Sequence, residues 1–435
     1  MRTIAFHTLG CKVNQAESDE LIRACGRQGF TVVPFDGHAD VYVINTCTVT
    51  NLADRRSRQT IRHARRKNPA GIVAVTGCYA QRAPREIGEI PGVSLIVPHG
   101  EKVFLLDRVR ELLDLNHSAT IPPSAAFPSS RTRALLKVQD GCPHGCSYCV
   151  IPSARGKGSS SPPGEVCEKL KSLIGEGSQE IVLTGIDLGS YGRDLNPRIH
   201  LADLLLEVAK IPRLPRVRLS SIDPRDCSER LLGTLRTLPW ICPHIHLPLQ
   251  SGSDRVLRAM KRGYTRRIFL EKVSRIRELL PATALTTDVM VGFPGEEESD
   301  FLETCDVVRE AGFSKLHVFP YSERPGTESA AYPEKVPEGV KEGRCRSLLG
   351  IGHELSGRHR LSMVGKVAEV VVEHTRESEG ELLSGVTGDY ARVFFFGDDS
   401  LVGKRVQIRI TGLFRSEAVE GVVEGVAGRD YAHQV

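Results

Sequence analysis

Three cysteines stand close together in the middle of the chain, in the run Cys142-Pro-His-Gly-Cys146-Ser-Tyr-Cys149. Three thiolates on one tight loop can bind three irons of a cubane cluster, and the fourth iron then stays open to a small molecule. Gly141 allows the backbone to turn around such a cluster. The same spacing also suits a zinc site in which His144 or a distant residue is the fourth ligand. The run alone therefore predicts metal chemistry of one of these two kinds.

Three further cysteines, Cys11, Cys47 and Cys78, each follow a predicted strand near the start of the chain. Strands alternate with helices there, a pattern typical of a parallel sheet. The predicted strands are Thr3–Thr8, Val41–Asn45 and Gly71–Thr76, and the predicted helices are Glu17–Gly29 and Asp54–Lys67. Parallel strands end at one edge of a sheet, where ligands bind in open α/β sheets. We therefore expect these three thiols to meet in space.

The rest of the chain predicts two more domains. Six βα units over roughly 200 residues indicate a full or partial βα-barrel; their strands are Ala134–Gln139, Ile181–Thr184, Val217–Ser220, Ile245–Pro248, Ala284–Val291 and Lys315–Phe319. Helices are predicted at Leu201–Ala209, Phe269–Leu280 and Glu298–Ala311. The tail has short β-branched runs that favour a small β-barrel; they are Val367–Glu373, Ala391–Phe396, Arg405–Ile410 and Val419–Val426. With a linker at Leu115–Arg131, the domains are expected at 1–116, 131–362 and 363–430.

Composition favours reduced thiols. The chain has 435 residues, 12 cysteines and a formal net charge of +5. It shows neither a secretory leader nor an apolar run of the roughly 20 residues that span a membrane. We therefore expect a cytoplasmic protein whose clustered cysteines bind metal rather than form disulfides. The isolated cysteines are expected to be incidental; these are Cys25, Cys167, Cys227, Cys305 and Cys345.

The Cys142–Cys149 run, with the residues around it, resembles the radical S-adenosylmethionine (SAM) superfamily. The resemblance implies that Cys142, Cys146 and Cys149 bind a [4Fe–4S] cluster whose open iron chelates SAM. Tyr148 stands where that superfamily carries an aromatic residue beside the SAM adenine, and Gly185 stands in the segment whose backbone meets the SAM amino group. One electron would then cleave SAM to a 5′-deoxyadenosyl radical. A second knuckle-like run, Cys242-Pro-His-Ile-His246, could instead supply zinc ligands, although its histidines more simply line the barrel interior.

The wider chain resembles the radical-SAM methylthiotransferases. Matching segments are Thr8-Leu-Gly-Cys11-Lys-Val-Asn-Gln15, Asn45-Thr-Cys47-Thr-Val, Thr76-Gly-Cys78-Tyr-Ala-Gln81, His246-Leu-Pro-Leu-Gln-Ser-Gly-Ser253 and Asp288-Val-Met-Val-Gly-Phe-Pro-Gly295. In that family the three N-terminal cysteines hold a second, auxiliary [4Fe–4S] cluster, which carries the sulfur to be transferred. An adenine C2–H is unactivated, so a carbon radical is needed to remove its hydrogen. The family also implies an electron donor such as a flavodoxin or ferredoxin.

The segment Gly10–Gln15 resembles the MtaB-type branch, as does Ser220-Ser-Ile-Asp-Pro224, although Glu is more usual at the position of Asp223. This branch implies methylthiolation of C2 of N6-threonylcarbamoyladenosine at position 37, in the anticodon loop of ANN-decoding tRNAs. The alternatives are isopentenyladenosine in tRNA, an aspartate of a ribosomal protein, or a zinc-stabilised RNA-binding protein without catalysis.

Several other residues are predicted to contact the cofactor or RNA. The resemblance places Ser220, Arg262 and Asp288 at the cofactor cavity, with Arg262 paired to a carboxylate. A stripe of arginines recurs at helical spacing and suits RNA phosphates, or is simply a solvated helix face; its members are Arg55, Arg58, Arg62 and Arg65. The tail resembles a TRAM domain, a small RNA-binding β-barrel. The tail has a net negative charge, so attraction to RNA phosphates would have to come from a local patch such as Lys404, Arg405, Arg409 and Arg415. The alternative is recognition of RNA shape or single-stranded bases.

Overall fold

The computed structural model describes residues 2–113, 132–377 and 381–426. The chain divides into two compact units. The first contains the described part of residues 1–129 together with 140–158 and 322–330, and the second contains the remaining described residues. The predicted linker, 115–131, lies outside the described residues. No described helix is both long enough and apolar enough to cross a membrane.

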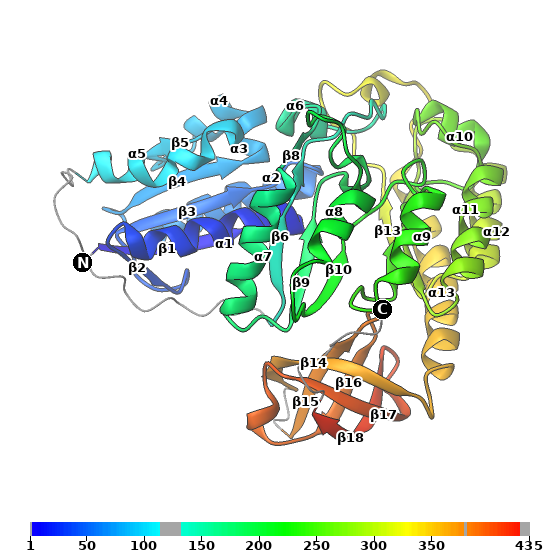
Figure 1. Ribbon diagram of the computed structural model, residues 1–435. Helices are drawn as coiled ribbons and strands as arrows, with labels where there is room; N and C mark the ends of the chain where they lie inside the picture. Colours follow the sequence, from blue (N-terminus) through cyan, green and yellow to red (C-terminus); the bar gives the residue numbers. More distant parts are fainter. Residues whose placement is uncertain (1, 114–131, 378–380, 427–435) are drawn as a thin grey trace. The chain divides into compact units, whose positions relative to one another are not determined.

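The first unit is built on a five-stranded parallel sheet of order β2-β1-β3-β4-β5 (Figure 1). Its strands are β1 (Arg2–Thr8), β2 (Phe30–Val33), β3 (Val41–Thr46), β4 (Ile72–Gly77) and β5 (Leu95–Ile96), and its longer helices are α1 (Lys12–Arg27), α2 (Asn51–Lys67) and α5 (Leu105–Leu112). The predicted parallel sheet is confirmed. The short strands β2 and β5 were not predicted from the sequence.

Strand β3 explains why this sheet is covered on both faces. All six of its residues are buried. Tyr42 and Ile44 pack in one apolar cluster with residues of α2, whereas Val41 and Val43 pack in another with residues of α1 and α5. Successive side chains of a strand point to opposite faces, so a strand buried on both sides reads as a continuous apolar run. Polar and reactive side chains, such as the thiols of Cys47 and Cys78, therefore lie at the ends of the strands.

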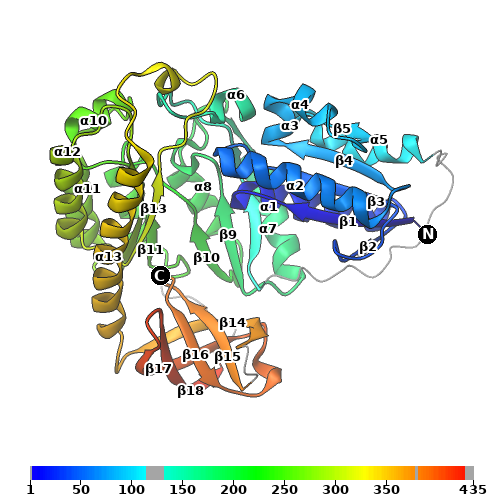
Figure 2. The same cartoon turned by 180° about the vertical axis from the view of Figure 1, so that it is seen from behind.

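The second unit contains a partial βα-barrel (Figure 2). Its parallel strands are β6 (Ala134–Lys137), β9 (Glu180–Thr184), β10 (Arg216–Leu219), β11 (His244–His246), β12 (Ala284–Val291) and β13 (Lys315–Pro320). Isolated bridges from Val217 to Ile241 and from Ser221 to His246 join β10 to β11. The strands therefore follow one another across a curved sheet, with β6 and β13 as its two edges.

The helices of this unit follow or precede the barrel strands along the chain. They include α7 (Pro163–Gly175), α8 (Leu201–Val208), α9 (Glu229–Thr237), α11 (Arg266–Leu279), α12 (Glu298–Ala311) and α13 (Glu338–Leu361). One large apolar cluster joins the outward side chains of the strands to these helices. The predicted βα-barrel is confirmed, in its partial form. Helix α13 was not predicted.

The chain ends in a closed five-stranded barrel of order β14-β15-β16-β18-β17. The strands are β14 (Val367–Arg376), β15 (Leu382–Thr387), β16 (Arg392–Phe396), β17 (Arg405–Phe414) and β18 (Ala418–Val426). Alternate apolar side chains fill its interior, among them Val370, Val393, Phe395 and Ile408. The predicted small β-barrel is confirmed, although β15 was not predicted.

Two arginines of β10 bind this C-terminal barrel to the amino-terminal end of the partial barrel. Arg216 donates to the carbonyl oxygens of Glu369 and Val386, at 2.9 and 2.8 Å. Arg218 donates to those of Gly388 and Thr387, at 2.8 and 3.0 Å. Both guanidiniums pair with the fully buried carboxylate of Glu180 in β9.

The ring of Tyr390 completes this junction. The guanidinium carbon of Arg218 lies 4.0 Å from the centroid of the Tyr390 ring, a cation–π distance. The same ring lies 4.8 Å from that of His244, at the start of β11. A side chain of the C-terminal barrel therefore reaches the inner face of the partial barrel at its base.

Candidate active site

The first unit brings Cys11, Cys47 and Cys78 to the carboxyl edge of its sheet, as expected. Cys11 caps the start of α1 just after β1, Cys47 follows β3 directly, and Cys78 opens α3 (Cys78–Arg82) directly after β4. The close approach of the first two loops requires Gly10. Its φ is +95°, and a Cβ there would lie 2.9 Å from the Cys47 sulfur.

Asn14, in the first turn of α1, contacts all three cysteine loops. Its side-chain amide donates to the carbonyl oxygens of Leu9 and Thr46, at 2.7 and 3.0 Å. Its amide oxygen lies 4.0 Å from the sulfur of Cys78. The Asn14 side chain is almost fully buried, so these contacts fix the loops as a unit. Asn14 stands three residues after Cys11 in the sequence, but an asparagine at that position does not by itself predict that its side chain joins the three loops.

Arg155 is the main site residue that sequence reasoning missed. It ends α6 (Ile151–Arg155), and its Nε donates to the Cys78 sulfur across 3.1 Å. Its Nη1 pairs with Glu17 at 3.1 Å and with Asp140 at 2.7 Å, and its Nη2 bonds to Asn14. The Arg155 side chain is fully buried. A buried guanidinium needs such partners because burying an unpaired charge is costly.

Two more groups complete this buried network. The Lys102 ammonium pairs with Glu17 and donates to the Asn45 side chain at 3.2 Å. His99 bonds to Asp140 at 3.1 Å. Burial lowers the pKa of His99 even though Asp140 opposes the shift, so this ring is neutral near pH 7. Burial lowers the pKa of Lys102 although Glu17 opposes the shift, so Arg155 is the permanent cation of this network that contacts a cysteine sulfur.

Burial also sets the state of the thiols. It raises the pKa of Cys47 to about 11, and neighbouring Cys78 and Cys11 add to the effect. Burial raises the pKa of Cys78 as well, although Arg155 acts against it. Metal ligands must be thiolates, so binding a metal here releases protons. Three sulfurs at one sheet edge, with the Arg155 guanidinium beside them, fit an anionic iron–sulfur cluster.

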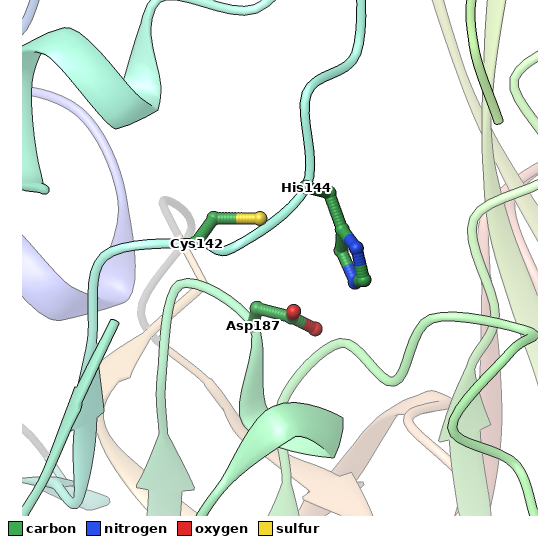
Figure 3. A group of neighbouring side chains, drawn as sticks. All are labelled: Cys142, His144 and Asp187. Atoms are coloured by element: carbon green, nitrogen blue, oxygen red, sulfur yellow. The ribbon is translucent and has the colours of Figure 1, made fainter. Parts of the chain in front are cut away.

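The Cys142–Cys149 loop belongs to the same compact unit. The Cys142 amide donates to the Gly156 carbonyl at 3.1 Å, and the Cys149 amide donates to the Cys146 carbonyl at 3.1 Å. Gly141 has a φ of +67°, and a Cβ there would lie 2.7 Å from the Gly156 oxygen. The three thiols are partly exposed. A fixed loop with three accessible sulfurs fits the predicted cubane, and Figure 3 shows Cys142 and His144 on it.

In the second unit, Gly185 and Ser220 lie together at the carboxyl ends of β9 and β10. The Gly185 amide donates to the Ser220 hydroxyl at 3.2 Å. A Cβ on Gly185 would lie 2.8 Å from the Gln139 side-chain oxygen, so the backbone there passes close to its neighbour. The same Gln139 oxygen accepts from the amide of Asp187 at 2.9 Å; Asp187 is also labelled in Figure 3.

The predicted carboxylate partner of Arg262 is Asp223. Arg262 Nη2 lies 2.7 Å from an oxygen of Asp223, and its Nε donates to the Tyr264 hydroxyl at 3.0 Å. Arg225 binds the same carboxylate at 2.8 Å. Burial raises the pKa of Asp223, but the two guanidiniums outweigh it and the net shift is downward. Arg262 is thereby held as a fixed cation in a buried position.

Asp288 lies in a hydrogen-bonded chain across β11, β12 and β13. The Thr286 hydroxyl bonds to His244 and to His246, at 2.9 Å in each case. His246 Nε2 lies 3.2 Å from one Asp288 oxygen, and His317 Nδ1 lies 3.3 Å from the other. Burial raises the pKa of Asp288, but its two histidine partners lower it well below the usual range. Asp288 is therefore ionised near neutral pH.

The zinc alternative drawn from Cys242, His244 and His246 does not match this arrangement. The Cys242 side chain is buried, and burial raises the pKa of its thiol to about 12. Both histidines turn to Thr286 instead. They line the inner face of the barrel, as the simpler interpretation predicted.

The predicted arginine stripe is on α2, but its members differ in their surroundings. Arg55 and Arg62 are exposed, whereas Arg58 and Arg65 are half-buried. Arg58 donates to the Tyr79 hydroxyl at 2.9 Å, and that hydroxyl bonds to Glu86 at 2.7 Å. Only part of the stripe is therefore open to a partner.

The comparison with known proteins decides the family. Residues 3–98 match an uncharacterised protein family, UPF0004, and residues 136–308 match the radical SAM superfamily. The chain is 40% identical, over 94% of its own length and 94% of the relative's, to the threonylcarbamoyladenosine tRNA methylthiotransferase MtaB of Bacillus subtilis. It belongs to the radical-SAM methylthiotransferases. Members of the superfamily use SAM and a [4Fe–4S] cluster, as expected from the Cys142–Cys149 run.

Three more comparisons place this methylthiotransferase. It is 41% identical to the MtaB protein of Aquifex aeolicus over 79% of this chain and 86% of that one. It is 33% identical to a tRNA-2-methylthio-N(6)-dimethylallyladenosine synthase of Syntrophotalea carbinolica, over 96% and 98%. A radical SAM methyltransferase of Kitasatospora setae, TsrM, shares the fold with a TM-score of 0.55 at 15% identity, over 75% of this chain and 77% of that one.

Proposed function

We propose that this methylthiotransferase places a methylthio group on C2 of N6-threonylcarbamoyladenosine at position 37 of tRNA. One observation carries the proposal: two separate sets of three thiols lie in one compact unit, and Arg155 contacts members of both neighbourhoods. It binds Cys78 of one set and Asp140, which stands two residues before Cys142 of the other. The similarity to MtaB proteins supports the threonylcarbamoyl substrate.

The proposed assignment gives each set a role. Cys142, Cys146 and Cys149 would hold the cluster that binds SAM, and Cys11, Cys47 and Cys78 would hold an auxiliary [4Fe–4S] cluster. When bound, these groups supply the electron that cleaves SAM and the sulfur that is transferred. We propose Tyr148, Gly185, Ser220, Arg262 and Asp288 as SAM or cavity contacts.

The protein's own residues would orient this chemistry. Asn14 fixes the three loops that carry the auxiliary thiols. Arg155 and Lys102 offset the negative charge that thiolates and sulfides bring into a buried site. Asp223 pairs with Arg262 and so holds a guanidinium that stays protonated inside the barrel. These groups hold partners in place and need not change protonation during turnover.

Partners follow from the same proposal. The substrate would be the anticodon loop of ANN-decoding tRNAs, with exposed Arg55 and Arg62 among the phosphate contacts and Arg58 and Arg65 beside them. A flavodoxin or ferredoxin would supply electrons. We place the activity in the cytoplasm, where tRNA is modified.

Mass spectrometry of tRNA nucleosides tests this function. Host cells without endogenous methylthiotransferases are compared with and without the chain. We expect 2-methylthio-threonylcarbamoyladenosine only when the chain is present. A methylthio-isopentenyl product instead would refute the substrate but keep the reaction. If neither nucleoside changes, the tRNA assignment is wrong.

A further inference from the structure

The inner face of β13 presents two basic side chains. Leu316 packs outward on α13, where a Cβ added to Gly352 would lie 3.1 Å from a Leu316 methyl carbon. Side chains alternate along a strand, so Lys315 and His317 face inward, into the partial barrel. Both are exposed, and the His317 side chain is 54% accessible. Since β13 is an edge strand, a ligand can reach them.

Three buried arginines inside the partial barrel are already committed to other partners. Arg216 and Arg218 share the Glu180 carboxylate and bind the C-terminal barrel. Arg262 is paired with Asp223. All three arginines are buried. By contrast, Lys315 and His317 are exposed, so their nitrogens are open to a ligand.

His317 is held in one orientation. Its Nδ1 lies 3.3 Å from Asp288 Oδ1, while the other oxygen of Asp288 lies 3.2 Å from His246. His246 is in turn fixed through Thr286, at 2.9 Å. With Nδ1 committed to Asp288, Nε2 is on the open side of the ring. An acceptor there can bind without the cost of first ordering the imidazole.

We propose that His317 recognises the carboxylate of the threonyl group of the substrate, with Lys315 adding positive charge from the same strand face. The inference rests on the proposed function and deepens it. The threonyl carboxylate is the one charged group that the N6 substituent carries into a cavity. The substrate carboxylate would accept a hydrogen bond at Nε2 while Asp288 accepts one at Nδ1, so the two ring nitrogens would bind one carboxylate each. An isopentenyl substituent is a neutral hydrocarbon, so it has no group that His317 or Lys315 could bind.

The test compares two anticodon stem-loops, one with threonylcarbamoyladenosine and one with its methyl ester, which lacks the charge. Dissociation constants and kcat/KM are measured for the wild-type enzyme and for His317→Phe, which keeps a planar ring but no donor. The wild-type enzyme should prefer the acid by about ten- to a hundredfold, as charge-assisted hydrogen bonds usually allow. His317→Phe should bind both stem-loops as the wild type binds the ester. His317→Gln, which can donate one hydrogen bond, should recover part of the preference.

Controls separate recognition from folding and from the parent proposal. His353→Phe changes an exposed histidine of α13 and should leave the preference for the acid unchanged. Iron content and melting temperature should match in all variants, which verifies that each is folded and loaded. If His317→Phe still prefers the acid as the wild type does, the inference is wrong while the function stands. If the wild type modifies neither stem-loop but modifies an isopentenyladenosine stem-loop, both are wrong.

Discussion

Arg155 Nε lies 3.1 Å from the sulfur of Cys78. The same guanidinium binds Asp140, two residues before the first cysteine of the radical-SAM loop. One side chain thus contacts both cysteine neighbourhoods of the first unit. A hydrogen bond to a metal-bound sulfur stabilises the more reduced, more negative form of a cluster and so raises its reduction potential.

Arg155→Met should therefore lower the midpoint potential of the proposed auxiliary cluster, measured by a redox titration followed by electron paramagnetic resonance. It should also cost about 3–5 kcal/mol of stability, because Glu17 and Asp140 lose a buried partner. Adding Asp140→Asn, which removes a carboxylate that has lost its guanidinium, should restore part of the stability but not the potential. An unchanged potential in Arg155→Met would show that this contact does not tune the cluster.

Cys47→Ala should separate SAM cleavage from sulfur insertion. Two cubanes contain about eight irons and one contains about four, so iron content should halve while 5′-deoxyadenosine is still formed. No methylthio nucleoside should appear. Cys345→Ala, at a partly buried thiol of α13, serves as the matched control and should keep both irons and product. Retained methylthiolation in Cys47→Ala would contradict the sulfur-carrier assignment.

Glu180 should make the second unit sensitive to acid. Burial raises the pKa of this carboxyl, but Arg218 and Arg216 outweigh it and lower the pKa from 4.5 to about 2. The folded pKa is below the unfolded one, so the stabilisation is full above pH 4.5 and is lost as the pH falls towards 2. It is on the order of 3 kcal/mol. The melting temperature of metal-free protein, followed from pH 7 to pH 3, measures this loss.

Glu180→Gln should melt lower than the wild type at pH 7, because two buried guanidiniums lose their counter-charge. Its melting temperature should then fall less steeply below pH 4.5, since the titrating group is gone. Parallel curves for the two proteins would mean that other carboxyls dominate acid unfolding.

The exposed arginines of α2 should matter for RNA affinity rather than chemistry. Arg55→Glu combined with Arg62→Glu should weaken binding of an anticodon stem-loop and reduce the salt dependence of log Kd by about one unit per lost phosphate contact. Arg346→Glu, on the exposed side of α13, is the control. Equal salt slopes for both proteins would identify the α2 stripe as a solvated face.

Local patterns predicted most of the framework. Strands β1, β3, β12 and helix α12 were foreseen within a residue or two, because the strands are rich in β-branched residues and the helix has a clear helical period. Helix α13 was missed because five glycines interrupt its pattern; they are Gly339, Gly343, Gly350, Gly352 and Gly357. Tertiary packing stabilises it instead. Gly352 admits Leu316, and Arg344 pairs with Glu296 at 2.7 Å.

The site residues that could be predicted are those recognisable in the sequence by their type and spacing. Cysteines are recognisable in this way. Cys11, Cys47 and Cys78 each follow a strand of one parallel sheet, so their meeting at one edge could be predicted from the sequence alone. Arg155 is not recognisable in this way, because its partners Cys78 and Glu17 are 77 and 138 residues away in sequence. The His246–Asp288–His317 chain is similar: it depends on the register of three strands, which sequence alone leaves open.

Tyr390 and the backbone carbonyls around it form a floor beneath the partial barrel. The C-terminal barrel is therefore not an interchangeable attachment. A foreign domain grafted after α13 would need to present four correctly placed carbonyl oxygens to Arg216 and Arg218. Without them, water would enter the partial barrel at the amino-terminal ends of its strands, and a carbon-centred radical inside the barrel reacts cleanly only when water is excluded. Substitutions in the partial barrel and in the C-terminal barrel would then have to remain compatible with each other at this junction.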